Sequence, residues 1–547
     1  MSRHSEVQCL FTWLMLICQT GCYLLDSLTA ARNFSYVHKY INTSNLEQDY
    51  CQRKRKLFSL DEWRLSTEKF TAALPIDSIQ ENYVREVRGS IFSAVHPTPF
   101  KSRVLLVGVS KEVMEDMLDL DVSVSDSEDF LQLVSGAKVI WGSLPLAHRY
   151  GGHQFGSWAG QLGDGRAHLI GVYTNRFGVS WELQLKGSGR TPYSSLVVSD
   201  DDVWRDRLYN GNVKKERGAI VLRVAKSWFR IGSLEILSHS GELELLRTLL
   251  DHVIDEHFPS IKRNDSNRYL AFFSTVVSET ANLMALWMSV GFAHGVCNTD
   301  NFSLLSVTID YGPFGFMDSY DPDFVPNTSD DERRYKIGNQ ANVGLFNLNK
   351  LLQALNRLLD SRQKQLASQI LMGYSEQYYR CFMEIFKRKL GLLGDDDGDN
   401  YLIAFLLKLM EDSRADFTMT FRQLSEISED QLKKLSIPKD FWALQDVAEH
   451  EFFSSWVDLY LLRLKSNIGD LDLERRRRMT GINPRYVLRN WMAESAAQKA
   501  EKNDFSEVRL LQQILQSPFQ MQTVAERAGY AQRPPAWAQD IKISCSS

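Results

Sequence analysis

Two neighbouring polar segments carry the side chains best suited to chemistry. Asp300 and Asn301 lie in the loop Asn298-Thr-Asp-Asn, and Asp310 follows in Thr308-Ile-Asp-Tyr-Gly. A magnesium ion that bridges nucleotide phosphates prefers carboxylate and amide oxygens, and a nearby carboxylate can accept a proton from an attacking hydroxyl. Asn and Asp are also turn formers, but a turn explains the loop and not the whole ordered arrangement. These residues predict a metal-assisted phosphotransfer site.

A glycine-rich segment lies upstream, in Gly160-Gln-Leu-Gly-Asp-Gly-Arg166. Gly163 and Gly165 would let the backbone approach phosphates closely and direct its N–H groups at them. Arg166 could add a charge-assisted contact. A glycine-rich hairpin turn without any ligand is the alternative.

Three further cations follow in the order that a nucleotide site would need. Lys186 ends an alternating strand, where a lysine is usually solvated, but its place after the glycine-rich turn is that of the phosphate-gripping lysine of a protein kinase. Arg223 lies between Leu222 and Val224 on a strand that reads as buried, where an unpaired arginine is costly. Arg223, with Arg230 close behind it, therefore needs an anionic partner, either a structural carboxylate or a phosphate.

The elements that must position these residues change in character along the chain. The pattern predicts strands at 104–109, 167–173, 179–186, 220–225 and 304–309, the last of which would deliver Asp310. A hairpin turn is expected at Asn175–Gly178. Helices are expected at 111–118, 126–133, 243–256, 278–292, 347–359, 363–387, 401–410, 447–464 and 485–499. A β-rich N-lobe before a helix-rich C-lobe predicts an α+β, protein-kinase-like bilobal fold.

Composition excludes some classes of function. The net charge of -5 argues against a general polyanion binder, so no nucleic-acid partner is expected. The seven scattered cysteines form no metal-ligand pattern and indicate mostly reduced thiols. The apolar run Leu10–Leu25 is shorter than the ~20 residues of a membrane span, so no stable span is expected. It is similar to a secretory signal, and a removed leader and a functional anchor remain alternatives.

Several longer motifs together resemble the selenoprotein O family. They are Tyr150-Gly-Gly-His-Gln-Phe-Gly-Ser-Trp-Ala-Gly-Gln-Leu-Gly-Asp-Gly-Arg166, Trp181-Glu-Leu-Gln-Leu-Lys-Gly187, Arg190-Thr-Pro-Tyr-Ser194, His294-Gly-Val-Cys-Asn-Thr-Asp-Asn301, Ile309-Asp-Tyr-Gly-Pro-Phe-Gly-Phe316 and Asn483-Pro-Arg-Tyr-Val-Leu-Arg-Asn490. The resemblance runs from about Leu60 to the C-terminus. It implies a kinase-like fold that binds ATP in an inverted orientation and transfers AMP to Ser, Thr or Tyr hydroxyls of protein substrates.

The resemblance also implies roles for individual residues. Asp300 would be the catalytic proton acceptor, and Asn301 and Asp310 would hold Mg²⁺, with Mn²⁺ as an alternative ion. Residues implied to contact the nucleotide are Gly163, Gly165, Arg166, Lys186, Arg223, Arg230 and Asp310. Cys545 stands where many animal members carry selenocysteine, which suggests a redox role, with an inert exposed thiol as the alternative. Animal members also suggest a mitochondrial location, with secretion as the alternative.

One departure from the family pattern affects the expected activity. The family has a helix equivalent to kinase αC after the Thr-Pro-Tyr-Ser motif, and this helix carries the Glu that pairs with the lysine. Here Ser194-Ser195 leads directly into Leu196-Val-Val-Ser-Asp-Asp-Asp, so that segment is absent. We therefore expect a leader and linker at 1–57, an N-lobe at 58–240 that lacks this helix, and a C-lobe at 241–547. A conventional phosphoryl-transferring kinase and an inactive nucleotide-binding or redox-signalling pseudokinase remain alternatives.

Overall fold

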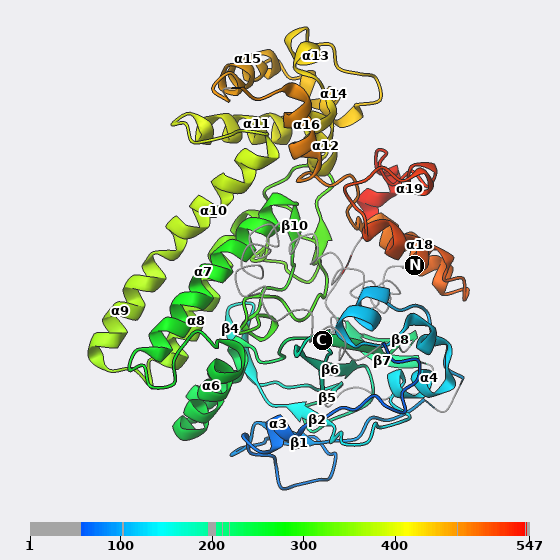
Figure 1. Ribbon diagram of the computed structural model, residues 1–547, viewed down its shortest axis with the longest axis vertical. Helices are drawn as coiled ribbons and strands as arrows, with labels where there is room; N and C mark the ends of the chain where they lie inside the picture. The colour runs from blue at the N-terminus through cyan, green and yellow to red at the C-terminus, as the bar shows by residue number, and fades with distance from the viewer. Residues whose placement is uncertain are drawn as a thin grey trace, which may run out of the picture.

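The N-lobe is built on one antiparallel sheet of five strands in the order β1-β2-β5-β6-β9 (Figure 1). The computed structural model describes residues 56–100, 103–194, 219–467, 469–541 and 543, together with the backbone of the strands at 204–209 and 212–217. The sheet strands are β1 (Phe92–Ala94), β2 (Leu146–His148), β5 (Ala167–Thr174), β6 (Ser180–Lys186) and β9 (Val221–Ala225). The predicted strands at 167–173, 179–186 and 220–225 are therefore confirmed.

The β5–β6 hairpin forms for the reason that the sequence indicates. The side chain of Asn175 accepts hydrogen bonds from the amides of Phe177 and Val179, and Gly178 adopts a φ of +74°. Leu183 and Leu185 pack into an N-lobe core with Trp63 and Ile170. The opposite, polar face of β6 is not solvated, because Gln184 is fully buried where the sheet meets the C-lobe.

Shorter elements surround this sheet. They are α3 (Glu68–Thr71), the π-helical turn η2 (Val113–Met117), the 3₁₀ turn η3 (Val122–Asp126), α4 (Glu128–Val134), the hairpin β3 (Gly151–Gln154) with β4 (Ser157–Gln161), and the hairpin β7 (Trp204–Tyr209) with β8 (Asn212–Arg217). The predicted helices at 111–118 and 126–133 correspond to η2 and α4.

The predicted strand at 104–109 is wrong. This segment runs along α18 (Ser506–Leu515) and pairs with none of the described strands. Arg509 Nε donates to the carbonyl of Val107 at 3.3 Å, and Gln512 Nε2 donates to that of Val109 at 2.6 Å. Side chains of a distant helix therefore occupy carbonyls that a neighbouring strand would otherwise use.

The C-lobe is helical: α8, α9 and α10 pack on the long helix α7, and α11–α16 gather at one end of the molecule (Figure 1). Its main helices are α5 (Ile231–Ser240), α6 (Leu243–His257), α7 (Arg268–Ser289), α8 (Gln340–Leu355), α9 (Ser361–Met372), α10 (Tyr374–Lys389), α11 (Asp399–Ser413), α12 (Phe417–Glu426), α13 (Glu429–Lys433), α14 (Trp442–Ala448), α15 (Phe453–Leu464), α16 (Asp472–Thr480), α17 (Asn490–Ala500), α18 and α19 (Thr523–Arg527). Short 3₁₀ turns lie at Thr299–Asn301 (η4), Ile337–Asn339 (η5) and Ala536–Asp540 (η6).

Two of the predicted helices are each divided in the structure. The predicted helix at 363–387 is interrupted at Gly373, which separates α9 from α10, and that at 447–464 is α14 followed by α15. Helix α7 begins ten residues earlier than the predicted helix at 278–292. Among the described residues it alone has the length and apolar composition of a membrane span, but 67% of the qualifying window is buried inside the protein, which identifies it as a core helix.

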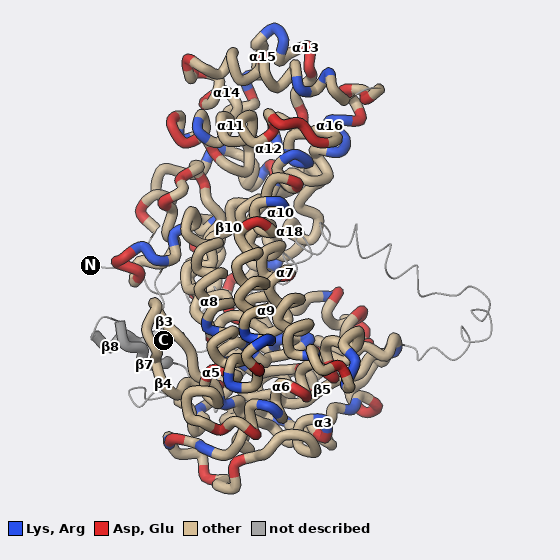
Figure 2. Tube along the Cα trace, turned by 90° about the vertical axis from the view of Figure 1, so that its left-hand side faces the viewer, with Lys and Arg blue, Asp and Glu red and all other residues tan. Residues whose placement is uncertain are grey.

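The lobes are joined through a shared core. Phe92 and Leu169 of the sheet belong to the same apolar cluster as Leu249 of α6 and Phe273 of α7, while α11–α16 form a second cluster at the far end of the C-lobe. A small antiparallel sheet followed by a large helical lobe is the predicted α+β, kinase-like fold. Acidic and basic residues are interspersed along the described chain (Figure 2).

Candidate active site

The loop at 298–301, called the catalytic loop because the family resemblance implies that its Asp300 is the proton acceptor, and the loop that carries Asp310 are brought together by a two-stranded ribbon. Strand β10 (Phe292–Ala293) pairs with β11 (Gly315–Phe316), which closes the intervening segment into a compact unit. The predicted strand at 304–309 is wrong. Ser306 has a left-handed φ of +55°, and the amide of Ser303 donates to the carbonyl of Val307 at 2.9 Å, so the chain turns here. This turn, and not a strand, delivers Asp310.

Asp300 lies in η4 as a nearly buried carboxyl group, 7% exposed. Its Oδ2 accepts a hydrogen bond from Gln154 Nε2 at 3.2 Å, while its buried Oδ1 has no hydrogen-bond partner among the described residues. Burial raises the pKa of this carboxyl to about 6. A carboxyl with a pKa near neutrality and an unsatisfied oxygen has the properties of a general base.

Asp310 meets two of the predicted cations. Lys186 Nζ lies 2.5 Å from Asp310 Oδ1, and Arg223 Nη1 lies 3.7 Å from the same oxygen. Burial opposes ionisation of this carboxyl, but the positive charges of Lys186 and Arg223 outweigh it and lower its pKa to about 2. The sequence indicates that the buried Arg223 needs an anionic partner, and in the structure this partner is the carboxylate of Asp310.

The two arginines are held by polar groups that the sequence reading did not single out. Asp164 Oδ1 lies 3.6 Å from Arg230 Nη2, and Asp164 Oδ2 accepts from Gln184 Nε2 at 3.0 Å. Gln184 Oε1 in turn accepts from Arg223 Nη2. The signal for Gln184 was its position two residues before Lys186, which places both side chains on one face of β6.

Arg230 also links Asp164 of the N-lobe to the catalytic loop. Its Nη1 donates to the carbonyl of Asp300 at 3.0 Å, and its guanidinium lies over the ring of Tyr150 at 3.8 Å. Arg230 precedes α5, and the side chain of Ser233 accepts from its amide at 2.9 Å. The start of α5 is therefore fixed against Asp300.

The glycine-rich segment forms the turn between β4 and β5, beneath the segment Thr191–Ser194. A Cβ on Gly163 would lie 2.4 Å from Cγ of Tyr193, and one on Gly165 would lie 3.0 Å from the Tyr193 carbonyl. Packing against Tyr193 therefore requires these glycines, whatever else they contact. Arg166 precedes β5, and its carbonyl accepts from the amide of Gly187, so it lies beside the end of β6 that carries Lys186.

The β3–β4 hairpin lies directly over the catalytic loop, which the sequence reading did not anticipate. The amide of His153 donates to Thr299 Oγ1 at 2.7 Å, and the amide of Phe155 donates to Asn298 Oδ1 at 3.2 Å. A Cβ on Gly152 would lie 2.9 Å from Asp300 Oδ1. The sequence signal for this contact was the glycine pair in Tyr150-Gly-Gly-His, since close backbone approach requires glycine.

The residues predicted to hold a metal have suitable chemistry. Asn301 Nδ2 donates to the carbonyl of Val296 at 2.8 Å, which leaves its amide oxygen as the group available to an ion. Asp310 is ionised at neutral pH, and the amide of Ile309 donates to the Asn301 carbonyl at 3.3 Å, so the two loops are adjacent. One carboxylate and one amide oxygen fit a magnesium ion that takes its other ligands from phosphate and water. No group of three or more His, Cys, Asp or Glu side chains within the described residues forms a separate metal site.

The C-terminal segment returns to the loop that follows Asp310. The amide and hydroxyl of Thr328 both donate to the carbonyl of Ile543, at 2.7 and 2.8 Å. The neighbouring Asn327 donates through Nδ2 to the carbonyl of Gly295 at 3.2 Å. Cys545 and the region of the expected gap, residues 195–203, lie outside the described residues, so the predictions made for them stay predictions.

Several known proteins are similar to this chain over most of its length. Protein nucleotidyltransferase YdiU of Azoarcus sp. is 39% identical over 520 aligned positions, which cover 88% of this chain and 98% of the relative. Proteins of the same name from Flavobacterium johnsoniae and Erwinia tasmaniensis are 37% and 38% identical and cover 87% and 85% of this chain, and 97% and 99% of the relatives. Because 88% of 547 residues is fewer than 520, the first alignment includes positions that have no counterpart in this chain.

A family model described as protein adenylyltransferase SelO matches in two pieces. The first piece covers residues 78–196 and the second covers residues 195–516. The pieces meet where the sequence reading placed the absent segment. Together they span most of the chain, including every residue of the site described above, and the chain therefore belongs to the SelO family of protein adenylyltransferases.

Proposed function

We propose that this enzyme transfers AMP from ATP to Ser, Thr or Tyr hydroxyl groups of protein substrates. The hydroxyl oxygen attacks the α-phosphorus, the bond from that phosphorus to the bridging oxygen breaks, and pyrophosphate leaves. The hydroxyl proton passes to the Asp300 carboxylate. Family membership supports nucleotidyl transfer, and the acceptor residues are our inference from the resemblance.

The cations of the site suit the remaining steps. Lys186, Arg223 and Arg230 converge on Asp310 and on the backbone of Asp300, where they would neutralise the charge of the triphosphate and of the departing pyrophosphate. Gly163, Gly165 and Arg166 would border the nucleotide from the N-lobe. Mg²⁺ held by Asn301 and Asp310, or Mn²⁺ in its place, would add a positive charge next to the phosphates.

One observation carries the proposal most directly. The two carboxyl groups of the site have pKa values moved in opposite directions, to about 6 for Asp300 and about 2 for Asp310. Such a separation supports a proton-accepting role for the first group and an anionic, cation-binding role for the second.

Labelled ATP tests this reaction. The full chain is incubated with a protein acceptor and ATP labelled separately at the α- or γ-phosphate. We expect protein-bound label only from the α position, with none from Asp300→Asn. Label retained only from the γ position would contradict AMP transfer and favour a conventional kinase.

A second candidate function is nucleotide binding without transfer. The two-piece family match and the unmatched positions of the relatives favour it, because both point to a segment that this chain lacks. In that case the chain would bind ATP and leave both labels in solution. Insertion of the corresponding segment of the Azoarcus relative after Ser195 would then restore transfer.

The mitochondrial location expected from the resemblance is also a proposal. Import assays on the full chain, compared with a chain that starts at Phe58, distinguish it from secretion. Protease-protected protein inside mitochondria supports the proposal, whereas protein in the secretory pathway contradicts it.

A further inference from the structure

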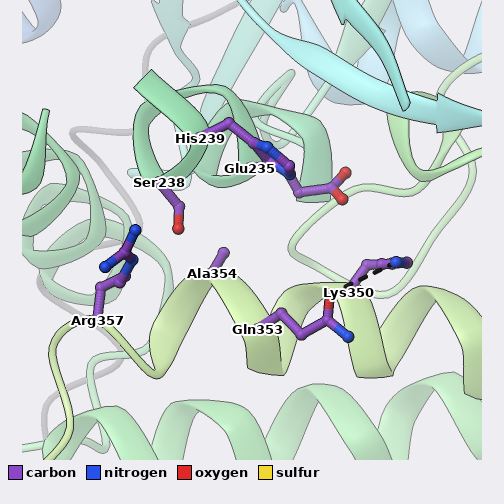
Figure 3. Close-up of a pocket in the computed structure, with 7 residues that line it drawn as sticks. All are labelled: Glu235, Ser238, His239, Lys350, Gln353, Ala354 and Arg357. Carbon is purple, nitrogen blue, oxygen red and sulfur yellow. Dashed lines mark hydrogen bonds between the residues drawn. The ribbon is translucent and has the colours of Figure 1, made fainter. Parts of the chain in front are cut away.

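A pocket separate from the active site lies between the C-terminal halves of α5 and α8 (Figure 3). It has a volume of about 250 Å³. This is several times the ~30 Å³ that one water molecule occupies in the liquid. The pocket can hold a phosphate group with a small organic part. The lining residues are Glu235, Ser238, His239, Lys350, Gln353, Ala354 and Arg357.

The lining carries two cations, Lys350 and Arg357, that form no ion pair with a carboxylate of the described residues. Within the described residues Arg357 forms no ion pair or hydrogen bond, and Lys350 contacts only the Gln353 side chain at 3.4 Å and the face of Phe346. Burial and the charges of His153, Lys350 and Arg357 lower the pKa of His239, against the opposing effect of Glu235. The basic groups therefore act on one another across the pocket.

Ser238 supplies a second, independent indication of a ligand. It is 8% exposed, and its hydroxyl has no hydrogen-bond partner among the described residues. Figure 3 shows this hydroxyl directed into the pocket on the side where Arg357 lies.

The acidic residue of the pocket is already engaged. Glu235 is 2% exposed, and its Oε1 lies 2.6 Å from His153 Nδ1. Its carboxylate points away from Ser238 and Arg357 (Figure 3). An anion beside Ser238 and Arg357 would therefore meet donors and positive charge, not this carboxylate.

We propose that this pocket binds a small phosphate-bearing anion distinct from the transferred nucleotide. The pocket offers the guanidinium of Arg357, the ammonium of Lys350, the imidazole of His239 and the hydroxyl of Ser238. These groups provide more hydrogen-bond donors and positive charge than a carboxylate ligand would need, and they match a phosphate dianion. Arg357 and Ser238 bind the phosphate oxygens, Lys350 supplies further positive charge, and the neutral His239 imidazole can donate a hydrogen bond.

Helix α5 connects this pocket to the active site. Its first turn packs against the catalytic loop, since a Cβ on Gly232 would lie 2.0 Å from the Gly151 carbonyl and 3.5 Å from Cα of Asp300. Glu235, one turn later, holds His153 of β3, whose amide bonds to Thr299. Occupancy of the pocket by the anion therefore changes the affinity of the active site for the nucleotide. This regulatory part of the proposal rests on the proposed function, whereas the binding of the anion does not.

Calorimetric titration of the full chain with inorganic phosphate at constant ionic strength tests the binding. The pocket variant combines Lys350→Gln with Arg357→Gln. A matched control removes two exposed charges from the neighbouring helix α9, by Arg362→Gln with Lys364→Gln, and Ser238→Ala probes the hydroxyl without a charge change. Arg223→Gln separates this pocket from the cations of the active site.

We expect phosphate binding to persist in Arg223→Gln and in the α9 control. It should weaken about tenfold or more in the pocket variant, and less in Ser238→Ala. Equal affinity in the pocket variant and the parent, or loss of binding only in Arg223→Gln, would overturn the proposal. Equally tight binding of acetate would overturn the assignment to phosphate.

The effect of the pocket on nucleotide binding is measured separately, through the dissociation constant of ATP. Phosphate should change the dissociation constant of ATP in the parent and not in the pocket variant, and an unchanged constant in both refutes the coupling. A chain without AMP transfer still gives the phosphate titration, so failure of the proposed function and failure of this site are distinguishable.

Discussion

Replacement of Asp300 by Asn should make the protein more stable at neutral pH while it removes the proposed base. Burial raises the pKa of this carboxyl from 3.8 to about 6, so the native state binds the proton more tightly than the unfolded chain does. Stability is therefore lost as the pH rises through this interval. The shift corresponds to about 3 kcal/mol of destabilisation at neutral pH, because one pKa unit is about 1.4 kcal/mol.

Asp310→Asn provides the matched comparison with the opposite sign. Its carboxyl has a pKa lowered to about 2 by Lys186 and Arg223, so its ionised form stabilises the native state above pH 3.8. Loss of this charge should destabilise the protein by about 2 kcal/mol at neutral pH, and the difference should shrink as the pH falls towards 2.

Urea unfolding between pH 2 and 8, without nucleotide or metal, measures both effects, because Asp310 titrates in the lower part of this range and Asp300 in the upper part. The stability of Asp300→Asn relative to the parent should rise from near zero at pH 4 to about 3 kcal/mol above pH 6. Absence of ligand matters, because bound ATP or Mg²⁺ would stabilise the parent by mass action. A difference that is independent of pH, or an Asp300→Asn variant that is less stable than the parent at pH 7.5, would refute the reasoning.

Three further predictions concern the architecture of the site. Gly152→Ala places a Cβ 2.9 Å from Asp300 Oδ1, so the AMP-transfer rate should fall about ten- to a hundredfold. In the control Gly481→Ala the new Cβ meets nothing closer than 3.5 Å, so the rate should stay unchanged. Equal rates in the two variants would contradict the predicted clash with Asp300. Asp164→Asn removes the carboxylate that faces Arg230 and should weaken ATP binding about tenfold by calorimetry, and unchanged affinity would rule out this positioning role. Chelation of divalent ions should abolish transfer, and Mg²⁺ or Mn²⁺ should restore it; transfer that survives chelation would exclude Asn301 and Asp310 as ligands of a required metal ion.

Much of the site could be predicted because its chemistry is local in the sequence. Asp300, Asn301 and Asp310 lie on adjacent loops, and alternation along β6 placed Lys186 on a face that turned out to be buried against them. The burial of Arg223 and its need for an anion also followed from its apolar neighbours.

The remaining features depend on contacts between distant segments. The glycine pair at 151–152 indicates a close backbone contact but not that its partner is Asp300, and no local pattern shows that Asp164 faces Arg230 across 66 positions of sequence. The incorrect strand at 104–109 has the same origin, since side chains of α18 occupy the carbonyls of Val107 and Val109. The incorrect strand at 304–309 has a local cause, because Ser306 turns the chain through a left-handed conformation. Apolar content alone did not distinguish these segments from strands.

Mass spectrometry of an acceptor protein after incubation with ATP and Mg²⁺ tests the central claim most directly. The account predicts a mass increase of one AMP group on a Ser, Thr or Tyr residue with the parent chain, and no increase with Asp300→Asn or Asp310→Asn. An increase of a single phosphate, or an AMP adduct that forms equally well with both variants, would contradict it.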